Sequence, residues 1–530
     1  MPGGPVLTPL NWLLALLPIL VLILTIIALR WSAPRAGALA WLVTVFLAWT
    51  VFGADAHLLA VASSKGLSLT LFVLSIIWTA VFLYNLLERL GAIEAIGRQI
   101  IGLAGNRLNQ GLLLSWAFSG FMQGIAGFGV PVAVVAPLMV MAGFTPVVAA
   151  ASALVGHAWA VSFGSMGSSY YSIQLVTKIP GEEIGPRMAL LFALPIVASG
   201  FAVAHIVSGT EGLRRGAGAI LVAGLLMSLL VWLMTRLGAP QIASVVPGLA
   251  GCGAIWAMAR VGALRRVARP EPPVAGLSPS GASGRLSFHL AFLPYYLLVA
   301  LTVISQIGPV KEATRGLAWG LDYPAVATSL GFQVEAERAY AKIRLLNHPA
   351  PLLLLSTFIA AAVFVLAGRW KKGAVQAALA STYRQCVPTS VGIATMVMMA
   401  LVMTDAGMTS LLAGGIAKGA GPAFPLLSPY VGVLGTFMTG SNTNSNVMFG
   451  PLQLETARSL GIGATTIAAV QSIGGSLGSA IAPAKVLIGT AIVGLSGRES
   501  DVIRRTLVYC LILVLLVGIE AWVFSYVIGR

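Results

Sequence analysis

The amino-acid sequence predicts an all-α polytopic membrane protein, with about twelve transmembrane helices and two re-entrant hairpins arranged as inverted repeats. Three observations support this fold class: the composition, the number of long apolar runs, and two apolar stretches interrupted by Gly, Pro and polar residues. Of the 530 residues, 58% are hydrophobic and 9% are charged, and the mean hydropathy is +0.93. Soluble chains carry about 25% charged residues, so this composition indicates a protein of the lipid bilayer.

A transmembrane helix needs roughly 20 predominantly apolar residues. Runs that approach this length lie near residues 10–30, 37–54, 67–87, 146–166, 188–208, 217–236, 242–260, 288–307, 350–368, 386–404, 464–482 and 506–528. Two further apolar stretches, 111–144 and 424–450, are interrupted by Gly, Pro and Asn. Irregular backbone at membrane depth is tolerated only where it is buried in protein or lines a polar cavity. These two stretches are therefore candidates for re-entrant hairpins.

The net charge of +16 comes from basic residues in short loops between the apolar runs. This distribution follows the positive-inside rule and argues against a nucleic-acid groove. The basic loops lie near residues 30–35, 89–107, 214–215, 260–285, 369–384 and 498–505. All six share the cytoplasmic side only if 111–144 enters and leaves on that side and 424–450 enters and leaves on the outer side. The loop charges thus predict two hairpins of opposite orientation.

An internal repeat agrees with this topology. The pattern Phe-Met-x-Gly occurs at 121–124 and again at 437–440. Inverted repeats with a broken helix in each half are typical of secondary transporters, which bind substrate where the repeats meet. We expect a membrane half at 1–268 with the first hairpin, a Pro-, Gly- and Ser-rich cytoplasmic linker at 269–287, and a second membrane half at 288–530.

The first hairpin contains FMQGIAGFG at 121–129. Gly127 and Gly129 permit close backbone approach, and a helix that begins at Pro131 would point its positive dipole end at an anion. Gln123 could orient a substrate by donating and accepting hydrogen bonds. The alternative is that the glycines only allow tight helix packing.

The second hairpin places a dense polar cluster in an apolar segment. The predicted substrate-binding residues there are Ser441, Asn442, Thr443 and Asn444. Unpaired polar groups in hydrocarbon cost several kcal/mol each, so these groups need one another, water or a ligand. The alternative is an outer polar loop between two spans.

Polar residues on neighbouring spans could complete the cavity: His157, Ser162, Ser165, Ser168, Gln471, Ser472, Ser476 and Lys485. Lys485 is a candidate counter-charge for an anion, with a lysine snorkelling to the interface as the alternative. His157 is a candidate proton acceptor, with a structural histidine as the alternative. We interpret Asp405 and Glu520 as structural.

The motifs of enzymes and cofactor sites are missing from the sequence. Cys252, Cys386 and Cys510 show no metal-binding or disulfide pattern. HExxH, GxSxG and nucleotide-binding loops are not found either. We therefore expect no enzyme activity, no cofactor, no metal site and no nucleic-acid partner.

Four sequence strings resemble the L-lactate permease family: GIAGFGVP at 124–131, AVSFGSMG at 160–167, TGSNTNSN at 439–446 and VGLSGRESD at 493–501. The similarity runs through nearly the whole chain. It implies a proton-coupled symporter that imports L-lactate or related 2-hydroxy monocarboxylates across the bacterial inner membrane. Its partners would then be a small organic anion, a coupling ion and the lipid bilayer.

This chain departs from the family pattern at three positions. Members commonly carry Glu where Gln123 stands and Asp where Asn442 stands, and they usually lack a lysine at the position of Lys485. Each change makes the expected site less negative, and an amide cannot carry a proton. The alternatives are therefore a sodium-coupled or uncoupled carrier of a dicarboxylate or sulfonate, or a channel or sensor on the same scaffold.

Overall fold

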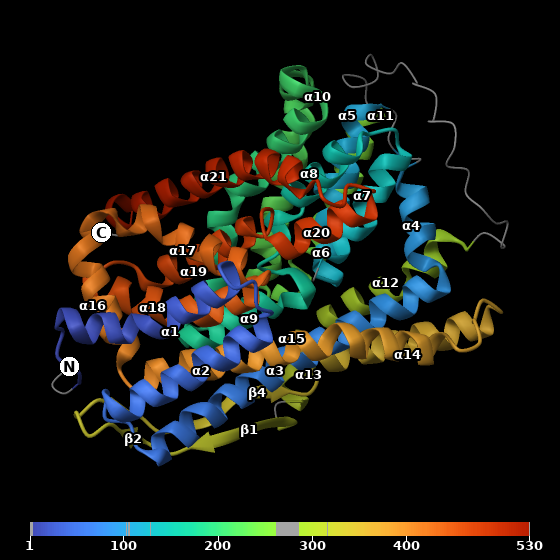
Figure 1. Ribbon diagram of the computed structural model, residues 1–530. Coiled ribbons are helices and arrows are strands. Elements are labelled where there is room, and N and C mark those ends of the chain that lie inside the picture. Colours follow the sequence, from blue (N-terminus) through green and yellow to red (C-terminus); the bar gives the residue numbers. More distant parts are fainter. Residues whose placement is uncertain are drawn as a thin grey trace.

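The computed structural model describes residues 4–101, 103, 106–127, 129–260, 286–314 and 316–528. The predicted all-α membrane architecture is confirmed. Ten of the described helices are long and apolar enough to cross a membrane, or eleven if one bent pair is counted as a span. The long helices lie side by side, with both chain termini at the same end of the bundle (Figure 1). The expected linker falls largely outside the described residues, which resume at 286.

The first half of the chain is helical throughout its described residues. Its helices are α1 (Pro9–Ile27), α2 (Ala33–Thr50), α3 (Ala56–Leu90), α4 (Ala92–Ile101), α5 (Arg107–Gly111), a π-helical turn (Leu112–Phe118), α6 (Ser119–Ile125), α7 (Val130–Met141), α8 (Pro146–Gly156), a short 3₁₀ turn (Ala158–Ala160), α9 (Gly164–Thr177), α10 (Gly181–Arg236), a second 3₁₀ turn (Pro240–Ile242) and α11 (Val245–Arg260).

The second half adds a small strand region to the helices. Its elements are α12 (Phe288–Ser305), α13 (Gly308–Ala313), β1 (Ala318–Tyr323), β2 (Val326–Ala327), β3 (Gln333–Val334), β4 (Glu337–Arg344), α14 (Pro349–Leu366), α15 (Ala374–Asp405), α16 (Met408–Ala420), a 3₁₀ turn (Gly421–Ala423), α17 (Phe424–Thr439), α18 (Asn442–Leu460), α19 (Ala464–Gly478), α20 (Pro483–Ile492), α21 (Glu499–Val523) and a terminal π-helical turn (Phe524–Ile528).

Every apolar run predicted as a span corresponds to a helix or a bent helix pair. The 56-residue α10 covers two of the predicted runs, and its backbone leaves helical geometry at Gly209. The two parts fold back on each other at this kink, because Ser228 Oγ lies 3.4 Å from the Ala193 carbonyl oxygen, so α10 supplies both predicted spans. The run at 146–166 is not a continuous helix, because α8 and α9 meet at a bend of 50°.

The strand region was not predicted. β1 pairs with β4 in antiparallel fashion, as β2 does with β3. Glu337 of β4 reaches the helices, where it lies 2.9 Å from Lys65 Nζ on α3. Lys65 also contacts Asp405 at 3.2 Å, and Lys178 contacts Glu337 at 3.1 Å. These ion pairs link the strand region to α3, α15 and the end of α9; Lys65 and Asp405 are buried, whereas Lys178 is exposed.

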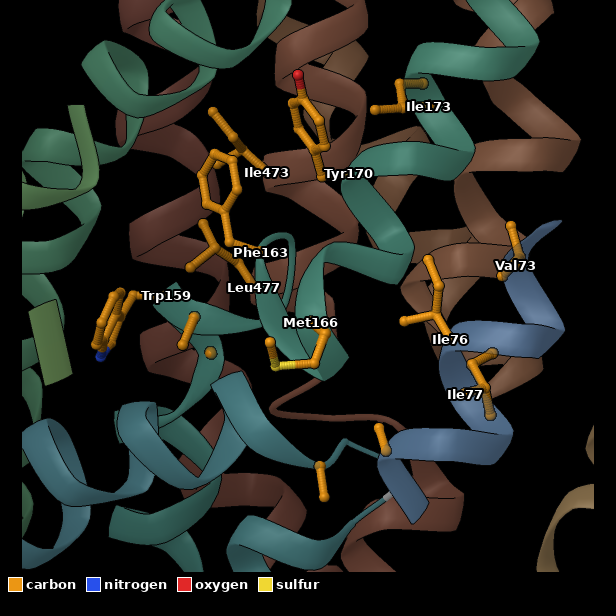
Figure 2. Packing of buried hydrophobic residues seen from close by; sticks show 14 of the residues in the cluster. Val73, Ile76, Ile77, Trp159, Phe163, Met166, Tyr170, Ile173, Ile473 and Leu477 are labelled. Atoms are coloured by element: carbon orange, nitrogen blue, oxygen red, sulfur yellow. The ribbon is translucent and has the colours of Figure 1, made fainter. Parts of the chain in front are cut away.

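A packed apolar core holds the broken helices in place. α15 packs along α2 and α3. α9 packs against α3, and α18 packs against α15 and α9. Figure 2 shows Phe163 and Met166 from the α8–α9 bend among side chains of α3 and α19, including Ile76 and Leu477. Such close packing fixes the position of the irregular backbone between these helices.

Candidate functional site

The first predicted hairpin contains a break in its helical structure. α6 ends at Ile125, and α7 begins at Val130 after Gly129, whose φ of 88° favours glycine. Gln123 on the last turn of α6 is buried, and its Oε1 makes no hydrogen bond with the described residues. A Cβ atom at Gly127 would lie 2.3 Å from Ser165 Oγ, so a glycine permits this close approach.

A second break in the same half lies between α8 and α9. Ser165 and Met166 have φ values of 46° and 55°, and Gly167 follows at 80°. Left-handed backbone is costly for non-glycine residues and often marks functional sites. The sequence signal for this break is the run of Gly and Ser residues at 162–169, which overlaps the end of the predicted span at 146–166.

The second predicted hairpin is also a broken helix. α17 ends at Thr439, Gly440 has a φ of 70°, and α18 begins at Asn442. Ser441 caps α18, because its hydroxyl accepts a hydrogen bond from the Asn444 backbone N–H at 3.3 Å. A further break separates α19 from α20, which begins at Pro483. Each half of the chain therefore contains two consecutive units of a helix, a break and a second helix. These are α6–α7 and α8–α9 in the first half and α17–α18 and α19–α20 in the second.

Hydrogen bonds join the breaks of the two halves. Asn442 Nδ2 donates to Ser162 Oγ at 3.2 Å and to the Ser472 carbonyl at 3.1 Å. Ser169 Oγ lies 3.0 Å from Thr443 Oγ1, and Asn446 Nδ2 donates to the Ser169 carbonyl at 2.9 Å. The predicted residues Asn442 and Thr443 of the second half thus lie within hydrogen-bond distance of Ser162 and Ser169 of the first half.

A small cavity lies where these breaks meet. Its volume is about 20 Å³, which accommodates a water molecule but not an organic anion. Eight of the nine predicted site residues line this cavity or a larger cavity beside it, the vestibule. Gln123, Gly127, Ser441, Asn442, Thr443 and Lys485 line the small cavity, and Asn444 lines the vestibule. Gly129 also lines the vestibule. Ser165, Ser168 and Ser169 complete the cavity wall.

The vestibule is a larger cavity of about 560 Å³ that shares Gly440, Ser441 and Lys485 with the small one. We call it the inner vestibule. Its other residues include Pro34 and Glu88, which belong to the ends of helices near the basic loops at 30–35 and 89–107. On the predicted topology this mouth faces the cytoplasm.

Three helix N-termini meet at the deep end of the inner vestibule. Val130, Ser441 and Lys485, each within two residues of the start of α7, α18 and α20, all line it. Helix N-termini present free N–H groups and a partial positive charge to anions. Lys485 is 4% exposed, and its Nζ has no ion pair or hydrogen bond with the described residues. The arrangement supplies an electropositive site without a protein counter-ion.

His157 does not line either cavity. Its Nδ1 lies 2.8 Å from the Ala153 carbonyl one turn earlier, which places the ring proton at Nδ1. Its Nε2 is buried and has no hydrogen-bond partner in the described part of the chain. Ser162, Ser472 and Ser476 lie behind the cavity wall as hydrogen-bonding partners. Across the described residues, no group of three or more His, Cys, Asp or Glu side chains forms a candidate metal site.

Comparison with known proteins decides the family. The family model for L-lactate permease matches residues 11–528, nearly the full length. The chain belongs to the L-lactate permease family. It is therefore a membrane transport protein of the bacterial inner membrane.

Relatives in the L-lactate permease family align over almost the whole chain. An L-lactate permease of Bacillus subtilis is 29% identical, over 99% of this chain and 98% of the relative. The glycolate permease GlcA of Escherichia coli is 27% identical, over 98% of this chain and 96% of the relative.

Among solved structures, the chain is similar to the YdaH transporter from Alcanivorax borkumensis. The sequences are 16% identical, and the match covers 86% of this chain and 84% of the YdaH chain, with a TM-score of 0.43.

Proposed function

We propose that this protein is a secondary active transporter that carries L-lactate or a related 2-hydroxy monocarboxylate, such as glycolate, across the inner membrane together with a proton. The names of the relatives support this substrate class. The observation that carries the proposal is the position of Lys485, on the wall shared by the small cavity and the inner vestibule. A carboxylate there would meet a buried cation and three helix N-termini.

The size of the site supports transport by alternating access. The small cavity between the helix breaks is too small for lactate, whereas the inner vestibule next to it is large and open to one side. We propose that substrate binds at the deep end of the inner vestibule. Movement of α7, α18 and α20 relative to α3 and α15 would then expose the same residues to the opposite side.

Lys485 also offers a route to proton coupling in a chain that has Gln123 and Asn442 where carboxylates are common in the family. A buried ammonium group without a counter-ion is energetically costly, and a bound carboxylate offsets that cost. Binding of the anion and binding of the proton to Lys485 therefore stabilise each other. His157 interacts electrostatically with Lys485 and is the alternative proton acceptor.

The test is uptake of labelled L-lactate into proteoliposomes. With an acidic exterior and no sodium, we expect accumulation that a protonophore abolishes. A proton gradient that drives no accumulation would contradict the proposal. Equilibration without accumulation would indicate a channel, and uptake only of dicarboxylates or sulfonates would indicate a different substrate class.

Sodium coupling is a second candidate, favoured by a set of buried oxygens without partners. Asn442 Oδ1, Asn446 Oδ1 and Thr436 Oγ1 make no hydrogen bond with the described residues. A Cβ atom at Gly475 would lie 2.1 Å from Asn442 Oδ1 and 3.0 Å from Thr436 Oγ1, so both oxygens face the same point. Hard cations prefer oxygen ligands. Accumulation driven by a sodium gradient at constant pH would establish this candidate.

A further inference from the structure

A second large cavity, of about 610 Å³, lies beyond the small cavity on the side away from the inner vestibule. Helix α3 runs past both large cavities: Phe72 lines this second cavity, while Ile77 and Glu88 line the inner vestibule. Five residues of helix span about 7.5 Å, so only a thin layer separates the two large cavities. We call the second one the outer vestibule, following the sidedness that the loop charges predict.

Helix α9 passes through this thin layer. Ser168 and Ser169 line the small cavity, and the next residues, Tyr170 and Tyr171, line the outer vestibule. The two tyrosine rings lie 5.3 Å apart, and Tyr171 lies 5.5 Å from Phe72. These rings form the floor of the outer vestibule and close it from the small cavity.

The wall of the outer vestibule is positively charged. Arg236 from the end of α10 and Lys342 and Arg344 from β4 line it, opposed by Glu182. None of these three cations forms an ion pair with the part of the chain that the structure describes, although Arg236 stacks over Trp232. Three cations against one carboxylate leave an excess of positive charge around a water-accessible space.

His348 supplies a neutral hydrogen-bond donor at the floor of the outer vestibule. His348 is 3% exposed and packs against Phe72 with ring centroids 4.4 Å apart. Its Nδ1 accepts a hydrogen bond from the Ala350 N–H at 3.2 Å, so the ring proton is on Nε2, which makes no hydrogen bond of normal geometry with any residue that the structure describes. Burial lowers the pKa of His348 to about 4, so the ring stays neutral at physiological pH.

We infer that the outer vestibule is a receiving site for the carboxylate of small organic anions, in which Lys342, Arg344 and Arg236 concentrate substrate ahead of the site at Lys485. This inference rests on the proposed function for its substrate class. Clefts lined by one sign of charge raise the local concentration and the association rate of oppositely charged ligands. Because these side chains are exposed, the site binds weakly and its effect declines as ionic strength rises.

The first test measures the local charge and does not depend on transport. A Gln174→Cys variant places a thiol on the vestibule wall, while the native cysteines are buried. We expect an anionic methanethiosulfonate to react faster than a cationic one, and the combined Lys342→Gln and Arg344→Gln changes to lower that rate ratio by about tenfold. Glu182→Gln should raise the ratio. Arg338→Gln, a change on the same strand that does not touch the vestibule, should leave it unchanged.

The second test uses L-lactate itself. L-lactate should slow thiol labelling at position 174, and the Lys342→Gln/Arg344→Gln variant should lose this protection and raise the KM for uptake at low ionic strength. An unchanged rate ratio, or labelling that L-lactate never slows, would overturn the inference. The proposed function fails by a separate result, the absence of gradient-driven uptake by the unaltered protein.

Discussion

The hydroxyl oxygens of Ser169 and Thr443, 274 positions apart in the sequence, lie 3.0 Å from each other on the wall of the small cavity. Each hydroxyl belongs to a helix that begins at a break in the backbone, α9 in the first half and α18 in the second. This contact shows that the two halves meet where helical structure is interrupted. Changes at this interface should therefore affect transport before they affect folding.

Asn442→Ala should reduce L-lactate uptake by about tenfold or more, because removal of the amide deletes its hydrogen bonds to Ser162 Oγ and to the Ser472 carbonyl. Membrane insertion and the gel-filtration profile should be unchanged. Uptake in proteoliposomes measures the effect. If the Asn442→Ala variant takes up L-lactate as fast as the unaltered protein, the N-terminus of α18 is not part of the substrate site.

Gly127→Ala should also block transport, because the added methyl group would lie 2.3 Å from Ser165 Oγ and 3.1 Å from Gln123 Nε2. The small cavity would lose its free volume, while rotation of the Ser165 side chain lets the helices remain packed. Gly253→Ala on α11 is the matched control, since a Cβ atom there meets open space. Equal uptake by the two variants would contradict a close approach at Gly127.

Lys485→Arg separates anion binding from proton coupling. Arginine keeps a positive charge at any physiological pH, so it can pair with a carboxylate but cannot release a proton. We expect this variant to exchange internal for external lactate and to lose accumulation driven by a proton gradient. Accumulation that persists in the variant would assign the proton to another group, with His157 as the first candidate and His157→Gln as the next variant to measure.

Lys65→Met should destabilise the protein by about 3–5 kcal/mol, because Asp405 would remain buried without its cation. The additional change Asp405→Leu should restore part of the loss. Thermal unfolding in detergent measures both effects. Arg498→Ala, which breaks an exposed ion pair with Asp501, serves as the control and should change stability little.

The sequence pointed to the parts of the site that carry a local signal. The density of polar groups around Asn442 inside an apolar segment predicted that the helix would break there, and the break lies between Thr439 and Asn442. Gln123 and its neighbouring glycines carried the same signal. Lys485 was singled out because a lysine follows Pro483 in an otherwise apolar region, and it lies on the shared cavity wall.

The features that sequence reasoning missed depend on contacts between distant segments. Lys65 pairs with Asp405, 340 positions away, and no local pattern indicates which acid a buried lysine will meet. The strands at 318–344 are short and irregular in register, so they lack a sustained alternation of apolar and polar residues. The outer vestibule forms because β4 lies beside the ends of α9 and α10. A hydropathy pattern does not show which distant segments lie next to one another.

Binding of labelled L-lactate to the purified protein, compared with the Lys485→Met variant, tests the central claim most directly. Loss of a buried charged partner for a carboxylate costs roughly 2 kcal/mol or more, which is about thirtyfold or more in affinity. We expect saturable binding by the unaltered protein, weakening of that order in Lys485→Met, and no change in Lys418→Met, a partly exposed lysine on α16. Equal affinity of Lys485→Met and the unaltered protein would contradict an anion site at Lys485.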